Sequence, residues 1–199
     1  MNTLRYYRDG EVGTERFDPN DGVAEILNMR GARLTKKDPV SGEVVEIAKI
    51  TSGIGRITNS TYDELNVYCI FYFSIPFNRK IKIGDVVDIR SINGFGDTAI
   101  VISDPADFVT RLKNEVINKG YLHDRQLVEY RDLRGFHGKV GPFIKDLTYK
   151  HQNELRVIVH RQEIQHPELT INIGSIEDIS CIIPTSELGE ITIESVPSK

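Results

Sequence analysis

Apolar and polar residues alternate with a period of two through much of this chain, and this alternation constrains its fold more than any other feature. The clearest alternating segments are rich in Val, Ile, Tyr and Phe and cover residues 66–74, 86–90, 98–103, 126–130, 154–160, 169–173 and 179–183, with weaker candidates at 44–50 and 4–8. This period is typical of strands that bury one face. We therefore expect a β-rich chain with mixed or antiparallel sheets.

Two segments predict helices that flank these sheets. Asp104 is a preferred N-cap, Pro105 suits the first helical position, apolar residues follow at helical spacing, and Gly120 provides a stop. A shorter helix is expected over residues 22–29, where three apolar residues fall on one face. One or two helices among many strands predict the α+β fold class.

Length and composition favour one domain over residues 1–199. The chain is 39% hydrophobic and 27% charged, which suits an ordinary core, and it contains no internal repeat or linker-like tract. Its formal net charge is −4, and no segment collects Lys and Arg into a dense block. A protein that coats nucleic acid through bulk electrostatics is therefore excluded, although a local basic groove stays open.

Cellular location is suggested by the cysteines and by the absence of targeting patterns. Cys69 and Cys181 lie far apart in apolar runs, which favours buried core thiols in a reducing compartment. No apolar stretch approaches the roughly 18 residues that a membrane-spanning helix needs, and the first residues lack the apolar core of a signal peptide. We expect a soluble, cytoplasmic protein with no membrane partner.

Several familiar motifs of cofactor binding and catalysis are either missing or lack the flanking elements and spacing that they require. Residues 52–55 and 93–96 each contain Gly-x-Gly, but neither has the preceding strand and following helix of a dinucleotide fingerprint. The five histidines lack the spacing of metal ligands, so no metal site is expected. A nucleophile elbow and a Walker loop are also missing, which removes support for the common hydrolase and nucleotide-hydrolysing classes.

One constellation survives, at the entrance to the strand expected over residues 154–160. Gln152, Glu154 and Arg156 are two residues apart, so their side chains should project to the same side of the strand, with the intervening apolar residues facing the core. An acid and an amide on a rigid strand end, with a cation beside them, make a reasonable polar site. The alternative is the solvent face of an antiparallel sheet, where Glu154 and Arg156 form an exposed ion pair.

Gln152-Asn153-Glu154 resembles the Gln-x-Glu motif of the ADP-ribosyltransferase superfamily, which begins a strand just after a turn that helps to recognise the target. In one branch of that superfamily, an Arg near the end of the first strand and a Ser at the end of a later strand precede the Glu. Arg8 or Arg5, then Ser74, then Glu154 match that order. The resemblance implies an ADP-ribosyltransferase-like fold.

The later part of the chain also resembles a large uncharacterised bacterial family that looks like a divergent relative of these transferases. The residues that carry this likeness are Val128-Glu129-Tyr130, Lys145, Tyr149, residues 152–156 and residues 173–176. That family often has Glu-x-Glu-x-Arg at the late motif. Residues 30–61 match nothing in either pattern, and their role is left open.

The resemblance implies an NAD-dependent transferase that displaces nicotinamide from NAD and passes ADP-ribose to a nucleophile. Glu154 would hydrogen-bond the nicotinamide-ribose hydroxyls and stabilise the developing positive charge. Gln152 would orient the acceptor group. These two residues are the expected catalytic pair.

NAD itself would be held by residues from three parts of the chain. Arg8, or alternatively Arg5, would pair with the pyrophosphate through the planar guanidinium. Ser74 would support the site, and Tyr149 or Phe73 would stack on the nicotinamide ring.

The acceptor macromolecule stays open between a nucleic acid and a protein. Lys145, Lys150 and His151 come just before the candidate Glu154, and enzymes that act on a single base can work from a small groove. Proteins of this kind often serve as bacterial toxins or phage-defence effectors, with a possible regulatory partner protein. Two other hypotheses are a non-catalytic β-rich module that binds or inhibits another macromolecule, and an assembly protein that associates through exposed strand edges.

Overall fold

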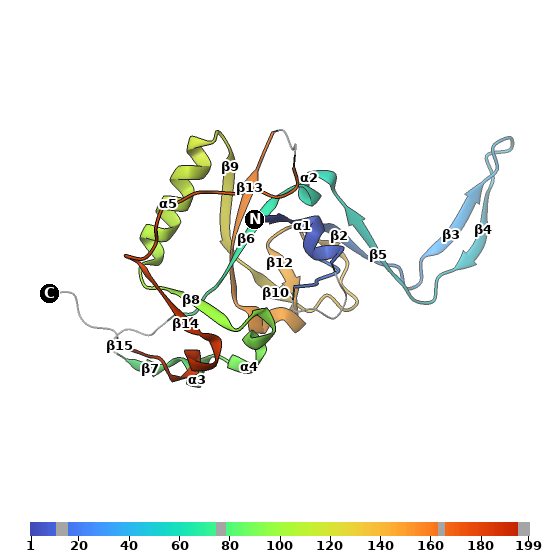
Figure 1. Cartoon of the computed structure of the whole chain (residues 1–199). Coiled ribbons are helices and arrows are strands. Elements are labelled where there is room, and N and C mark those ends of the chain that lie inside the picture. Colours follow the sequence, from blue (N-terminus) through green and yellow to red (C-terminus); the bar gives the residue numbers. More distant parts are fainter. Residues whose placement is uncertain (11–15, 75–78, 163–165, 195–199) are drawn as a thin grey trace.

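The computed structural model describes residues 1–10, 16–74, 79–162 and 166–194. A four-stranded antiparallel sheet lies at its centre (Figure 1), and its strands, in spatial order, are β1 (Asn2–Thr3), β6 (Asn66–Phe71), β13 (Glu154–His160) and β9 (Leu122–Leu127). β13 is buried on both faces, because Val157 and Val159 belong to one core cluster and Ile158 to another. The expectation of a strand over residues 154–160 is confirmed.

Helix α5 (Pro105–Asn118) covers one face of this sheet. The side chain of Asp104 accepts a hydrogen bond from the backbone N–H of Asp107 at 2.9 Å, which caps the first turn as the sequence predicts. Phe108, Leu112 and Val116 are buried at helical spacing and pack against β13. The amphipathic pattern of α5 thus places the main core between helix and sheet.

A second antiparallel sheet has the order β11 (Gly138–Lys139), β2 (Val23–Asn28) and β5 (Ile54–Thr58). The helix expected over residues 22–29 is therefore wrong, because β2 pairs with a strand along each edge. Gly22 has φ +69°, and a Cβ there would lie 3.0 Å from Leu4 Cβ. This close, left-handed turn suits glycine and directs β2 into the sheet.

Three expected strands are absent from the described residues. Residues 4–8 form α1 (Leu4–Arg8), which begins where the Thr3 side chain accepts from the N–H of Tyr6 at 3.3 Å. Residues 83–92 form α3 (Ile83–Val86) and α4 (Ile89–Ile92) in place of the strand expected at 86–90. Residues 169–173 form neither a strand nor a helix. Short apolar runs fit a strand or a helix equally, and tertiary packing decided these cases.

The remaining elements are short. They comprise the parallel pair β10 (Glu129–Arg131) and β12 (Ile144–Asp146), the antiparallel pairs β8 (Thr98–Ile102) with β14 (Ser180–Pro184) and β7 (Lys80–Lys82) with β15 (Thr192–Glu194), helix α2 (Ser60–Asp63), and the 3-10 turns η1 (Asn93–Phe95), η2 (Leu147–Gln152) and η3 (Thr185–Glu190). The strands expected over residues 98–103 and 179–183 are confirmed to within one residue.

Strands β3 (Arg33–Lys37) and β4 (Val44–Lys49) form a hairpin that projects away from the rest of the chain (Figure 1). Every residue in both strands is exposed. This hairpin, residues 33–49, is called the arm below. It accounts for most of the segment that matched neither family pattern.

The chain is a mixed α+β structure, rich in sheet, with few helices and open antiparallel sheets. That coarse fold class is the one the sequence predicts. None of the helices in the described ranges combines the length and the apolar character that a membrane crossing requires.

Candidate functional site

An inner cavity of about 490 Å³ lies beside the start of β13. Lys145, Gln152 and Glu154 form its polar wall, and Tyr68 and Phe71 are among the aromatic residues that line it. A volume of this size, with apolar walls and a few convergent polar groups, is typical of sites for small molecules.

The local backbone places Glu154 at the edge of this cavity. Asn153 adopts a left-handed conformation, with φ 40°, between η2 and β13, and its side-chain amide donates to the carbonyl oxygen of Tyr72. The N–H of Glu154 donates to the hydroxyl of Tyr130 at 2.9 Å. Glu154 also pairs with Phe71 in the sheet register. The carboxylate is therefore held on a backbone fixed from both sides.

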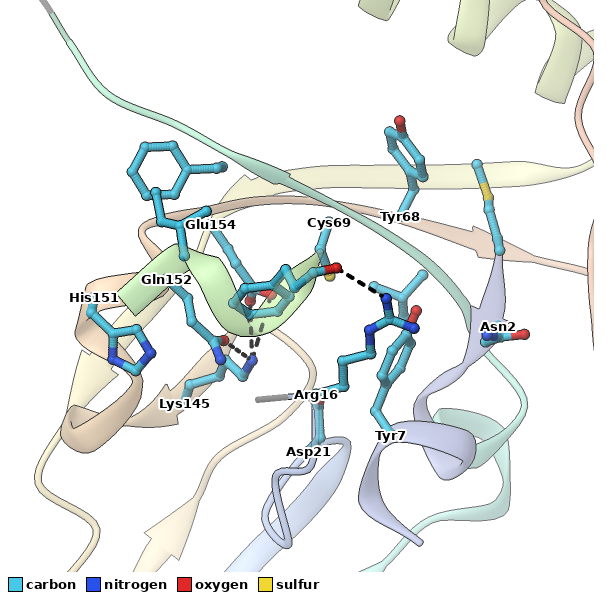
Figure 2. A pocket seen from close by; sticks show the side chains of 15 residues that line it. Asn2, Tyr7, Arg16, Asp21, Tyr68, Cys69, Lys145, His151, Gln152 and Glu154 are labelled. Atoms are coloured by element: carbon cyan, nitrogen blue, oxygen red, sulfur yellow. Dashed lines mark hydrogen bonds and ion pairs between the residues drawn. The ribbon is translucent and has the colours of Figure 1, made fainter. Parts of the chain in front are cut away.

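Lys145 contacts the other two polar side chains of the inner cavity, Gln152 and Glu154. Its Nζ lies 2.5 Å from Gln152 Oε1 and 3.4 Å from Glu154 Oε2, and Arg156 Nη2 lies 3.2 Å from the same Glu154 oxygen. Figure 2 shows Lys145, Gln152 and Glu154 pointing toward one another. The alternative of an exposed ion pair is therefore wrong, because the side chains of Glu154 and Arg156 are both buried.

Glu154 is ionised at neutral pH. Burial by itself raises the pKa of this carboxyl, but the charges of Arg156 and Lys145 outweigh that effect and hold the pKa below its ordinary value. The same two cations fix the direction of the carboxylate. The site thus contains a preoriented anion inside a cavity.

Arg156 joins this site to the turn before β2. Its side chain has no exposed surface, and its Nη1 donates to Asp21 Oδ1 at 2.7 Å. Burial lowers the pKa of Arg156, whereas Asp21 and Glu154 raise it by more, so the guanidinium stays charged. Its Nε has no hydrogen-bond partner among the described residues. Nearby, burial and the charge of Asp21 raise the pKa of Asp18 to about 6.

An outer cavity of about 710 Å³ adjoins the inner one, because Tyr7 and Arg16 line both. Arg5 and Tyr6 contribute further cationic and aromatic walls to the outer cavity. Arg16 Nη2 donates to the carbonyl oxygen of Phe95 at 3.5 Å, and Figure 2 shows Arg16 beside Tyr7. Tyr7 and the cation Arg16 therefore form a wall that the two cavities share.

The structure brings together only some of the residues that the sequence singled out. Glu154 and Gln152 line the inner cavity, and Arg5 lines the outer cavity. Arg8 lines neither of these cavities, and its Nη1 lies 2.5 Å from Asp63 Oδ1, where it joins α1 to α2. Of the two expected arginines, Arg5 is the one that faces the site.

Ser74, Phe73 and Tyr149 also lie outside the walls of both cavities. Ser74 is exposed beyond the end of β6, and the ring of Phe73 lies 6.3 Å from that of Phe71. The ring of Tyr149 lies 5.3 Å from Lys145 Nζ in a cation–π contact. Of the three aromatic residues Phe71, Phe73 and Tyr149, Phe71 is the one that lines the inner cavity.

Tyr7, Arg16 and Asp21 are site residues that sequence reasoning missed. Asp21 lies in the turn-rich stretch before β2, whereas nothing in the local sequence marks Tyr7 or Arg16. Tertiary packing alone brings these three residues to the site.

The expectation that both cysteines belong to the core is wrong. Cys69 and Cys181 both have accessible surface, and Cys69 lies on the wall of the inner cavity.

No protein-family model matches this chain, and no solved structure matches it significantly. The likeness at residues 152–154 to the ADP-ribosyltransferase motif therefore stays a prediction.

Proposed function

We propose that this chain binds NAD across the two adjoining cavities, cleaves its nicotinamide–ribose bond and transfers ADP-ribose to a macromolecule. The observation that carries the proposal is a pair of neighbouring cavities that share Arg16, with the ionised Glu154 on the wall of the inner one. A dinucleotide consists of two nucleosides joined by a pyrophosphate. It therefore needs two compartments with positive charge between them.

The side chains of the two cavities fit this molecule. Arg16 offers a planar guanidinium that can donate two parallel hydrogen bonds to the pyrophosphate, and Arg5 adds a second cation in the outer cavity. Phe71 and Tyr7 give the inner cavity aromatic surface suited to a nicotinamide ring. In this arrangement Arg16 takes the role that the resemblance gave to Arg8 or Arg5.

The chemical step belongs to Glu154. When the bond between the ribose C1′ and the nicotinamide nitrogen breaks, its electron pair moves to that nitrogen and positive charge develops on the ribose. A carboxylate that is already ionised and oriented stabilises this charge through the ribose hydroxyls. An oxygen or nitrogen of the acceptor then bonds to C1′ and loses its proton to water. If water is the acceptor, the product is ADP-ribose.

Gln152 is the residue best placed to meet the acceptor. Lys145 donates to its amide oxygen at 2.5 Å, so the direction of the side-chain NH₂ group is fixed. A fixed donor beside the reacting carbon selects the orientation of an incoming nucleophile.

The proposal is tested by nicotinamide release from NAD, measured chromatographically with the purified chain. Glu154→Gln keeps the shape of the side chain and removes its charge, so the rate should fall by about a hundredfold or more. Glu129→Gln is the matched control, because Glu129 forms an exposed pair with Arg131 away from both cavities.

Glu154→Gln also changes a buried charge cluster, so Arg16→Ala provides an independent variant outside that cluster. It should raise KM for NAD while the fold stays intact by circular dichroism. No release by the wild-type chain, or equal rates for wild type and Glu154→Gln, would contradict the proposal.

The second candidate is a non-catalytic module that acts as a partner or inhibitor of another macromolecule. One observation favours it: two cations within 3.4 Å already neutralise the carboxylate of Glu154. Thermal unfolding separates the two candidates. NAD that binds the folded chain raises the melting temperature by linkage, whereas an unchanged melting temperature at high NAD concentration supports the module.

A further inference from the structure

Strand β9 forms an open edge of the central sheet. Among the described residues it pairs with β13 along one side, and no strand pairs with its other side. Five of its six residues are exposed. The backbone N–H and C=O groups along an unpaired edge can bind a further strand. β9 is therefore a surface on which the sheet can be extended.

The sheet register shows which backbone groups of β9 point outward. The N–H of Val128 donates to the carbonyl oxygen of Glu154 at 2.9 Å, and in an antiparallel pair such bonds recur at every second residue. The bonds to β13 therefore use the even-numbered residues of β9. The backbone groups of His123, Arg125 and Leu127 point away from β13, toward the open edge.

The side chains of His123 and Arg125 lie on the face of the sheet that α5 covers. His123 pairs with Val159 and Arg125 with Val157, and both valines belong to the core cluster that packs against α5. Residues directly opposite each other in a sheet share a face. A strand added to β9 opposite these residues therefore directs alternate side chains toward α5.

A groove of about 250 Å³ lies between α5 and β9 on this face. Val109, Leu112 and Val116 of α5 give it an apolar wall, and Lys113 of α5 and Arg125 of β9 add two cations. Domains that bind peptides by strand addition combine two parts: backbone bonds along an open edge give affinity, and pockets for alternate side chains give specificity. Here the edge of β9 supplies the first part and the groove supplies the second.

The two cations of the groove are unpaired within the part of the chain that the structure describes. Lys113 and Arg125 are exposed and form no ion pair there, whereas Arg111 on the same helix pairs with both Asp107 and Asp178. Unpaired cations attract an acidic group, and a carboxylate can bond to both. The groove therefore favours a segment that carries a carboxylate among apolar side chains.

Asp124 also lines the groove, but its carboxylate belongs to the other face of the sheet. It pairs with Ile158, which is part of the core cluster opposite α5. Asp124 Oδ1 accepts from the backbone N–H of Arg125 at 2.7 Å. Among the described residues, the N–H groups of His123 and Leu127 are left as the outward donors of the strand.

We propose that β9 and α5 form a docking groove for an extended segment of a partner protein, which adds a strand to β9. This segment carries an acidic side chain opposite Arg125 and apolar side chains two residues to either side. The acidic group pairs with Arg125 and Lys113, and the apolar side chains pack on the wall formed by α5. None of the residues that line this groove lines the inner or the outer cavity, so the inference does not depend on NAD cleavage.

A second copy of β9 is the less suitable occupant of the edge. In an antiparallel pair with two-fold symmetry, one residue lies opposite its own copy, because directly opposed residues share a face. A pairing centred on the middle of β9 therefore places Asp124 opposite Asp124, or Arg125 opposite Arg125. Like charges in direct opposition destabilise a sheet.

Fluorescence anisotropy with the full chain tests the proposal, and the labelled probe is the peptide Thr-Val-Thr-Glu-Thr-Val-Thr. It should bind saturably, and Arg125→Glu and Lys113→Glu should each weaken binding about tenfold or more, because each places a like charge near the acidic group. Arg30→Glu is the matched control: Arg30 is exposed between β2 and the arm, at the other end of the molecule (Figure 1), and its loss should leave the affinity unchanged.

Amide hydrogen exchange distinguishes strand addition from simple charge attraction. Bound peptide should slow exchange at the N–H groups of His123 and Leu127 about tenfold or more. The same peptide N-methylated at both Val residues and at Glu loses its bonds to β9 and should not bind. No binding of the unmodified peptide by the wild type, or binding unaffected by Arg125→Glu or by N-methylation, would overturn the proposal. Slow exchange of the same amides without peptide, increasing with chain concentration, would also overturn it and assign the edge to a second copy.

Discussion

Arg156 has the most consequential environment of any single side chain in the site. It is fully buried between Asp21 and Glu154, and its guanidinium holds two segments together that are far apart in sequence. The loss of a buried cation of this kind is costly because of the charges that it leaves behind: Asp21 would lose its guanidinium partner, and Glu154 would keep only Lys145.

Arg156→Met is therefore expected to lower the free energy of unfolding by about 3 to 5 kcal/mol. Urea denaturation measures this change. Arg131→Met is the matched control, because Arg131 pairs with Glu129 at the surface and should cost less than about 1 kcal/mol. Equal costs for the two variants would contradict the described environment of Arg156.

The raised pKa of Asp18 should make the stability of the fold depend on pH. Its pKa is raised from 3.8 to about 6 by burial and by Asp21, so between these values the folded chain binds more protons than the unfolded chain. The free energy of unfolding should consequently fall as pH rises from about 4 to 7, by up to about 3 kcal/mol from this group.

Asp18→Asn removes that dependence and retains an oxygen that can accept from the N–H of Asn20. Denaturation curves at a series of pH values should show the variant gaining stability relative to the wild type across that window. Parallel curves for the two proteins would show that Asp18 does not titrate as described.

At the scale of elements, the turn between η2 and β13 controls the position of Glu154. Asn153 combines a left-handed backbone with a side-chain bond to the carbonyl of Tyr72. Asparagine tolerates this conformation better than most residues with a side chain.

Asn153→Ala should lower the free energy of unfolding by about 1 to 2 kcal/mol, because alanine strains the backbone and removes the amide. Asn153→Gly relieves the strain and loses only the amide bond, so its cost should be smaller. Chemical denaturation of both variants checks this order. An alanine variant as stable as the glycine variant would contradict a role for backbone strain.

The elements show where sequence reasoning succeeds and where it fails. Residues 154–160 and the helix after Asp104 are long and strongly periodic, so local pattern and packing agree. Residues 22–29 carry a helical spacing of apolar residues, yet strands on both edges offered more hydrogen bonds than an isolated turn of helix. Short segments are decided by their neighbours in space.

The candidate site likewise contains residues that the sequence predicts and residues that it does not. Glu154 could be predicted, because it begins a strand with strong local periodicity. Gln152 lies in η2 and not on that strand, so it reaches the inner cavity from the turn that precedes Glu154. Arg16 and Tyr7 could not be predicted, because they reach the site through packing of the N-terminal segment against β6 and β13. The resemblance implied Arg8 or Arg5 as the cation for the pyrophosphate; Arg5 lines the outer cavity, whereas the ion pair of Arg8 with Asp63 directs Arg8 to α2.

At the scale of the whole molecule, the site and the arm occupy separate parts of the chain. The inner cavity lies where α1, β6 and β13 meet, the outer cavity lies beside α1, and the arm projects from β2 and β5 (Figure 1). Variants of the arm are therefore expected to leave the walls of both cavities unaltered.

Calorimetric titration of the purified chain with NAD is the most direct test of NAD binding across the two cavities. We expect saturable binding of one NAD per chain, weakened about tenfold or more by Arg16→Ala, because a charged donor to the pyrophosphate is lost. Arg134→Ala, which removes an exposed guanidinium paired with Asp132, should leave the affinity unchanged. Absence of binding by the wild type, or an affinity unaffected by Arg16→Ala, would show that NAD does not bind in this way.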